Sequence, residues 1–138
     1  MRWMIDLNVV LDVFQRREPF YEASAQILSK VLRREATGCL PSHLLTTLHY
    51  VLQRNGNAET AGEVLDWVLE HLEIVPQDLA TFQRARQLPF ADFEDAALAS
   101  AAEKAGCQLI VTRNVKDFSG SPVPASTPAE LLAAESSP

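Results

Sequence analysis

The sequence has few of the side chains that build disulfide scaffolds or zinc sites. Its two cysteines, Cys39 and Cys107, do not form a Cys-x-x-Cys pair. Its three histidines, His43, His49 and His71, lack the four-residue spacing that places two imidazoles on one helix face. A disulfide framework and a zinc ribbon are therefore disfavoured. We expect the cysteines to be buried free thiols in a reducing compartment.

Long hydrophobic runs are also missing from the chain. No apolar stretch approaches the roughly 18 residues that a membrane-spanning helix needs. The N-terminal segment MRWMIDLNVV reaches polar residues too early for the apolar core of a signal peptide. We therefore expect a cytoplasmic protein with no membrane association.

Positive charge is scarce as well. The chain has 12 Lys and Arg residues against 18 Asp and Glu residues, a formal net charge of −6. Non-specific nucleic-acid binding depends on neutralising phosphates with basic side chains, so a general nucleic-acid coat is disfavoured. An enzyme that meets phosphates through a bound cation stays compatible with this charge, because the cation inverts the local electrostatics.

Short apolar strands alternate with amphipathic helices along the chain, which predicts an α/β domain around a mostly parallel sheet. The expected strands cover residues 3–7, 39–40, 73–76, 109–111 and, as a proline-marked edge strand, 123–125. The length fits one domain, which we place at residues 1–134, with a last helix through Leu132 and a frayed tail at 135–138.

Polar residues follow several of these strands. In an open parallel sheet the ligand crevice lies outside the carboxyl ends of the strands. Asp6, Ser42 and Asn114 each follow a strand, and Asp95 begins a helix expected at the same edge. Gathered carboxylates repel one another unless a cation lies between them. Because Mg²⁺ and Mn²⁺ prefer oxygen ligands and activate water for attack on phosphorus, the pattern favours phosphodiester hydrolysis.

Simpler structural roles compete with metal binding at the start of the 92–105 helix. Asp92 lies three residues before Asp95, the spacing of an N-cap residue and the third helical position. Glu94 faces a different side of the helix from Asp95 and is expected to be exposed to solvent.

Other polar residues near the expected edge also have two interpretations. Asn8 fits an N-cap of the first helix better than a metal ligand, and Asp12, one turn later, fits a solvated residue. Arg113 and Lys116 are candidate phosphate contacts, although exposed cations are common beside turns.

Four segments resemble the PIN-domain family, which includes the VapC-type toxins of bacterial toxin–antitoxin pairs. They are IDLNVVLDVF near the N-terminus, RREPF at 16–20, SHLLTTLHYVL at 42–52 and FEDAALASAAEKAGCQLIVTRNVKDF at 93–118. The resemblance implies a three-layer α/β/α sandwich with a parallel sheet of about five strands. It also implies a metal-dependent ribonuclease site.

Carried over by residue, the resemblance matches Asp6 to the first family acid, Asp95 to the third and Asn114 to the fourth position. The second acid, usually glutamate, falls at Thr47, and Asp117 lies near the fourth position. The expected site has catalytic residues Asp6, Asp95, Asn114 and Thr47, metal ligands Asp6, Asp95 and Asp117, and substrate contacts Asn8, Thr112, Arg113 and Lys116.

Three functional hypotheses follow. The first is an Mg²⁺- or Mn²⁺-dependent endoribonuclease, the toxin of a pair, with an RNA substrate, a cognate antitoxin protein and a homodimeric state. The second is a PIN-fold module that binds RNA or protein without turnover, because the second carboxylate is replaced by Thr47. The third, a small-molecule phosphatase or phosphotransferase, is disfavoured because the chain has no Asp-x-Asp-x-Thr motif.

Overall fold

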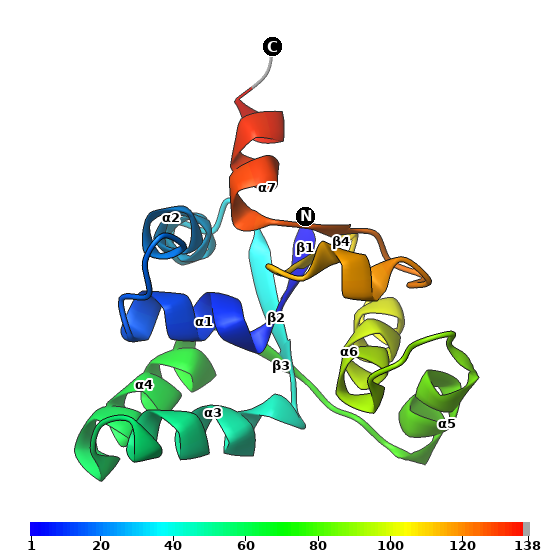
Figure 1. Cartoon of the computed structure of the whole chain (residues 1–138), viewed down its shortest axis with the longest axis horizontal. Coiled ribbons are helices and arrows are strands. Elements are labelled where there is room, and N and C mark those ends of the chain that lie inside the picture. Colours follow the sequence, from blue (N-terminus) through cyan, green and yellow to red (C-terminus); the bar gives the residue numbers. More distant parts are fainter. Residues whose placement is uncertain (137–138) are drawn as a thin grey trace.

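A five-stranded parallel sheet forms the centre of the protein (Figure 1). The computed structural model describes residues 1–136. The strands are β1 (Arg2–Ile5), β2 (Thr37–Pro41), β3 (Glu73–Val75), β4 (Leu109–Val111) and β5 (Ala125–Ser126), in the spatial order β3-β2-β1-β4-β5. All four strand pairings are parallel, which confirms the predicted α/β fold class.

Helices cover both faces of this sheet. They are α1 (Leu7–Phe14), α2 (Tyr21–Leu32), α3 (Leu44–Arg54), α4 (Ala58–His71), α5 (Leu79–Gln87), α6 (Phe93–Lys104) and α7 (Pro128–Glu135), with a 3₁₀ turn η1 (Val115–Phe118). In Figure 1, α1 to α4 lie on one side of the strands and α5 and α6 lie on the other, giving the expected three layers.

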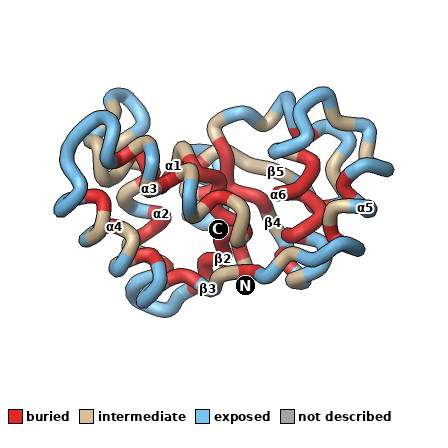
Figure 2. The backbone as a smooth tube through the Cα atoms, turned by 90° about the horizontal axis from the view of Figure 1, so that it is seen from below, coloured by how far each residue is buried: buried red, intermediate tan, exposed pale blue. Residues whose placement is uncertain are grey.

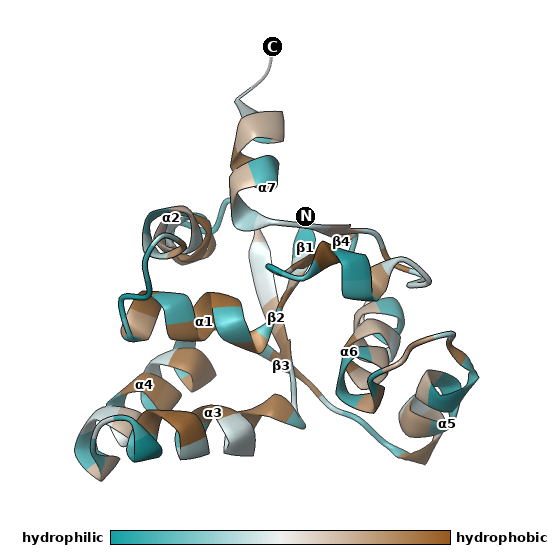
Figure 3. Ribbon diagram, viewed as in Figure 1, coloured by the Kyte–Doolittle hydropathy of each residue, from teal (hydrophilic) through white to brown (hydrophobic). Residues whose placement is uncertain are grey.

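The core lies where these layers meet. Trp3, Met4 and Ile5 of the central strand β1 are at most 1% exposed, as expected for a parallel strand that is covered on both faces. Burial is concentrated in the strands and in α6 (Figure 2). Hydrophobic residues colour the inner strands and much of α3 and α4 (Figure 3).

The alanine-rich helix α6 is buried around most of its surface. Residues 96–102 are all buried, with Leu98 and six small residues between the sheet and α5. Small side chains let the buried part of the helix lie close to the strands, and its half-exposed first turn begins at the carboxyl edge of the sheet. This placement fixes the position of Asp95.

The strand register brings the carboxyl ends of all the strands to one edge. Asp6 N donates to Val111 O at 3.0 Å, Ser42 N donates to Val75 O at 3.0 Å, and Thr112 N donates to Ser126 O at 3.0 Å. Each of these three residues directly follows β1, β2 or β4 and is hydrogen-bonded to the last residue of a neighbouring strand at the carboxyl edge of the sheet.

Some element boundaries differ from the sequence-based expectation. The first helix is capped by Asp6 instead of Asn8, because the strand ends at Ile5. The last helix does not end at Leu132 but continues to Glu135, whose Oε1 lies 3.3 Å from Lys30 Nζ of α2. Glu135 is thus the last helical residue at the start of the tail expected at 135–138, and residues 137–138 lie outside the described part of the chain.

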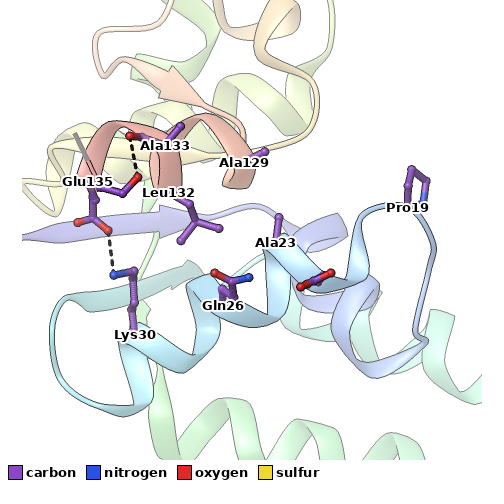
Figure 4. Close-up of a pocket in the computed structure, with 10 residues that line it drawn as sticks. Pro19, Ala23, Gln26, Lys30, Ala129, Leu132, Ala133 and Glu135 are labelled. Atoms are coloured by element: carbon purple, nitrogen blue, oxygen red, sulfur yellow. Dashed lines mark hydrogen bonds and ion pairs between the residues drawn. The ribbon is translucent and has the colours of Figure 1, made fainter.

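A cavity of about 630 Å³ lies between α2 and α7 (Figure 4). The side chains that the close-up labels include Ala23, Leu132 and the Lys30–Glu135 ion pair. None of the candidate site residues lines this cavity.

Both cysteines are buried free thiols, as predicted. Within residues 1–136, no helix is long and apolar enough to cross a membrane.

Candidate active site

Asp6 lies at the turn between β1 and α1, and both of its carboxylate oxygens accept hydrogen bonds. Its Oδ1 accepts a hydrogen bond from Leu7 N at 2.7 Å, which caps α1, and its Oδ2 accepts one from Thr112 Oγ1 at 2.7 Å. The residue is 9% exposed. Burial raises the pKa of Asp6, and the hydrogen bonds from Thr112 and Leu7 oppose that rise.

Thr112 connects two of the predicted site residues. It is fully buried at the end of β4, and its Oγ1 donates to Asp6 while accepting a hydrogen bond from Asn114 N at 3.0 Å. Because its hydroxyl both donates and accepts a hydrogen bond, Thr112 orients the Asp6 carboxylate and holds the backbone at Asn114 in place. The Asn114 side chain is left exposed beside η1.

Asp95 lies in the first turn of α6. Asp92 Oδ1 accepts a hydrogen bond from Asp95 N at 3.0 Å, so Asp92 is the N-cap of the helix as expected, and Glu94 is exposed as expected. Burial raises the pKa of Asp95 to about 7, with further contributions from the charges of Asp92, Asp6, Asp117 and Glu94.

An acidic cavity of about 330 Å³ opens beside Asp95. It is lined by Asp92, Asp95, Lys116 and Asp117 together with apolar and small residues of the 89–91 segment and Ser119. Asp6 does not line this cavity, but its charge contributes to the raised pKa of Asp95.

The chemistry of these donors fits a hard divalent cation. The acidic side chains that line the cavity supply oxygen, and burial together with the neighbouring carboxylates raises the pKa of Asp95. A bound cation would favour the ionised carboxylates. Among the described residues, however, no three His, Cys, Asp or Glu side chains form a ready metal cluster. Mg²⁺ typically takes only one or two protein carboxylates directly and completes its shell with water and substrate oxygens.

Comparison with known proteins assigns the family. The family model described as PIN domain matches residues 2–116. This protein belongs to the PIN-domain family. It is 31% identical over 119 residues to Ribonuclease VapC1 of Aquifex aeolicus (strain VF5), covering 83% of this chain and 81% of that protein. The resemblance found in the sequence motifs is thus confirmed.

Solved structures share the fold of this PIN domain. A DNA-bound VapBC from Salmonella typhimurium matches with a TM-score of 0.71 and 20% identity, covering 93% of this chain and 98% of that one. The sarcin-ricin loop cleaving toxin VapC20 of Mycobacterium tuberculosis matches with a TM-score of 0.65 and 11% identity, covering 78% and 86%. At these identities the likeness shows the fold alone.

Thr47 stands on α3 of the PIN domain, where the resemblance placed the second family acid. It is half-buried, and its side chain makes no hydrogen bond within residues 1–136. The nearby positions with polar contacts are Ser42, His43 and Gln77, which follow β2 and β3 at the same edge.

Asp12 is not the solvated residue that we expected. It is fully buried, its Oδ2 lies 3.1 Å from Arg113 Nε, and Ser24 Oγ donates to the same oxygen at 3.5 Å. The Asp12–Arg113 contact is an ion pair without hydrogen-bond alignment, since the Nε and Asp12 Oδ1 are buried without hydrogen-bond partners in the described chain. Burial raises the pKa of Asp12, and the charge of Arg113 opposes this.

The other side chains that were expected to contact substrate differ in how many contacts they already make within the protein. The Arg113 guanidinium lies 4.1 Å from the centroid of the Phe20 ring, besides its contact with Asp12. Asn8 Oδ1 accepts a hydrogen bond from Arg17 Nη1 at 3.2 Å. Lys116 is exposed and lines the acidic cavity, so it is the basic side chain best placed beside Asp95.

Sequence reasoning missed the supporting roles of two polar residues: Thr112 was expected to contact substrate and Asp12 to be solvated. Asp12 and Thr112 act through side-chain contacts with elements distant in sequence, and no local pattern indicates them. His43 and Gln77 could have been found, because they follow predicted strands at the edge where ligands bind.

Proposed function

We propose that this PIN domain is a metal-dependent endoribonuclease. The observation that carries the proposal is the placement of Asp6 and Asp95 at the carboxyl edge of the sheet, where burial, followed by the charges of Asp92 and Asp6, raises the pKa of Asp95 to about 7. The relative at 31% identity, named as a ribonuclease, supports RNA as the substrate.

In this proposal Asp6 and Asp95 hold Mg²⁺ or Mn²⁺, and Asp117 assists from η1. When bound, the ion supplies an activated water and stabilises charge on the phosphoryl group. Thr112 keeps Asp6 in the orientation needed for binding, through the 2.7 Å hydrogen bond to Oδ2. Asn114 faces the attacking water, and Lys116 contacts a phosphate of single-stranded or loop RNA.

Metal removal tests this function directly. We expect purified protein to cleave single-stranded RNA in Mg²⁺ or Mn²⁺, to lose all cleavage in excess EDTA, and to regain it when the ion is returned. Cleavage that survives complete chelation would exclude the proposal. RNA binding without cleavage under every metal condition would favour a PIN-fold binding module, for which the neutral Thr47 is the supporting observation.

The pH dependence of stability provides a second test. The pKa of Asp95 is about 7 in the folded protein, against an ordinary value of 3.8. Between these values the folded state holds a proton that the unfolded chain has released, so this group's contribution to stability falls as pH rises. Without metal, Asp95→Asn should therefore show a smaller loss of Tm than the wild type between about pH 5 and about pH 8.

Added Mg²⁺ should change that comparison. At about pH 8 the ion should raise the Tm of the wild type more than that of Asp95→Asn, because ligands that bind only the folded state stabilise it. Equal shifts in both proteins, measured by calorimetry, would place the ion away from Asp95.

The toxin of a toxin–antitoxin pair is the proposed biological setting. Solved relatives of the same fold include VapBC from Salmonella typhimurium and VapBC2 from Rickettsia felis, both bound to DNA. The acidic cavity at Asp95 and Asp117 suits a basic side chain inserted by an antitoxin. We further propose a homodimer. Growth arrest on expression that a coexpressed neighbouring gene product relieves, and a dimeric mass by light scattering, would support these two statements.

A further inference from the structure

A second, smaller cavity adjoins the one between α2 and α7. Its volume is about 240 Å³, and the two cavities share Pro19, Ala23 and Ala129, which Figure 4 labels. Its walls are mostly apolar, and its polar side chains include Arg113 and Ser24. Sites for drug-sized ligands have volumes of about 300–1,000 Å³, so this cavity suits a ligand no larger than a single fused ring system.

This cavity is linked to the proposed active site through two consecutive residues. Thr112 donates a hydrogen bond to Asp6 Oδ2 at 2.7 Å, and the next residue, Arg113, lines the cavity. The Arg113 side chain runs toward α1, where its Nε lies 3.1 Å from Asp12 Oδ2. In a nucleotide only the sugar separates the base from its phosphate. A phosphate beside Asp6 and a base in this cavity are therefore compatible with one RNA strand.

The charge of Arg113 is already balanced, whereas its outer hydrogen-bond donors are unused. Its counter-ion Asp12 is fully buried, and its guanidinium lies 4.1 Å from the centroid of the Phe20 ring. Within residues 1–136, the terminal Nη1 and Nη2 atoms of Arg113 make no hydrogen bond. A neutralised guanidinium attracts a phosphate weakly. Its planar pair of donors still matches a neutral, planar ligand that has two adjacent acceptors.

Guanine is the RNA base that matches this cavity best. Its O6 and N7 atoms are adjacent acceptors, and arginine binds them in the commonest base-specific contact. Adenine presents an amino donor beside N7, which would face the donors of Arg113. Unpaired RNA bases also stack on aromatic rings and guanidinium planes. The Phe20 ring, which is 39% exposed, and the guanidinium above it both line the cavity.

We infer that this cavity binds an unpaired guanine of the RNA substrate, and that Arg113 determines this specificity by donating to O6 and N7 of the base. The inference rests on the proposed function and adds a sequence preference to it. An Arg113–Asp12 pair with a purely structural role would support cleavage equally whatever base the RNA carries. The base preference therefore separates the two roles.

The test uses short single-stranded RNAs that differ at one base. The first carries a guanine within a chain of uridines, the second carries 7-deazaguanine, which lacks the N7 acceptor, and the third carries adenine. In Mg²⁺, we expect the wild type to cleave the guanine RNA with a kcat/KM at least about 10-fold above that for the adenine RNA, as for a bidentate base contact. The 7-deazaguanine RNA should lie between the two.

Two substitutions should remove this preference. Arg113→Lys keeps the charge that balances Asp12 but loses the planar pair of donors, so its kcat/KM values for guanine and adenine RNA should agree within about twofold. Ala23→Leu fills the cavity from α2, leaves the ion pair in place, and should have the same effect. Arg54→Lys is the matched control, because Arg54 also lies over an aromatic ring, that of Tyr50, but outside this cavity. It should keep the full preference.

The outcomes distinguish this inference from the function on which it rests. Equal cleavage of all three RNAs by the wild type would exclude the guanine site and leave the ribonuclease proposal intact. Equal fractional losses on all three RNAs in Arg113→Lys and Ala23→Leu would also exclude it, since they indicate a structural effect. If the wild type cleaves no RNA in any divalent metal, the ribonuclease proposal fails. Fluorescence anisotropy with the same RNAs then decides the guanine site, which requires tighter binding of guanine RNA that Arg113→Lys abolishes.

Discussion

Replacing Asp95 by asparagine should reduce metal-dependent RNA cleavage by at least about 100-fold, because a cation's stabilisation of phosphoryl charge is worth several kcal/mol. The substitution keeps the side-chain shape and removes the carboxylate that is proposed to bind the ion. The fold should be retained, since the cap of α6 is made by Asp92 Oδ1 and the backbone N of residue 95. Cleavage of labelled RNA in Mg²⁺ provides the measurement.

Glu94→Gln is the matched control for this substitution. It removes one negative charge from the same helix turn, at an exposed position that does not line the acidic cavity. Its activity should stay within about twofold of the wild type, as for surface changes away from a site. A fully active Asp95→Asn, or equal losses in both variants, would contradict the assignment of Asp95 as a ligand.

The largest expected effect on stability comes from Asp12. Replacing it by alanine should lower the free energy of unfolding by about 3 kcal/mol, because Arg113 would be left without its buried counter-ion. Asp12 is fully buried beneath α2, and the Arg113 side chain is 23% exposed. This partial exposure lets the freed guanidinium reach water and keeps the effect at the lower end of the usual range. Chemical denaturation measures the change.

Asp66→Ala provides the comparison, since Asp66 is an exposed acid on α4. Its free energy of unfolding should change by less than about 0.5 kcal/mol. If Asp12→Ala were as stable as Asp66→Ala, the Asp12–Arg113 contact would contribute nothing measurable. Arg113 would then be available as a phosphate contact after all.

The principal acids could be predicted because their placement depends on local sequence. Asp6 directly follows a buried strand, and Asp95 begins a helix three residues after a capping acid. A parallel sheet brings such positions to one edge whatever the details of packing. The family resemblance then selected these two acids from the others, and the match over residues 2–116 confirmed the family.

The partners of buried charged groups could not be predicted in this way. The Asp12–Arg113 ion pair joins residues that are far apart in the sequence, and Thr112 donates its hydrogen bond to Asp6 across a separation of 106 residues. Such contacts depend on how α1 and α2 lie against the end of β4. A local pattern also placed the first helix cap at Asn8, because Asp6 and Asn8 are both common capping residues and only the strand end decides between them.

A crystal structure of the protein soaked in Mn²⁺, with anomalous scattering measured at the manganese edge, tests the proposed metal centre most directly. We expect one strong anomalous peak bound by carboxylate oxygens of Asp6 and Asp95, and no such peak in crystals of Asp95→Asn. Absence of a peak in the wild type, or a peak bound by neither of these residues, would contradict the proposed site.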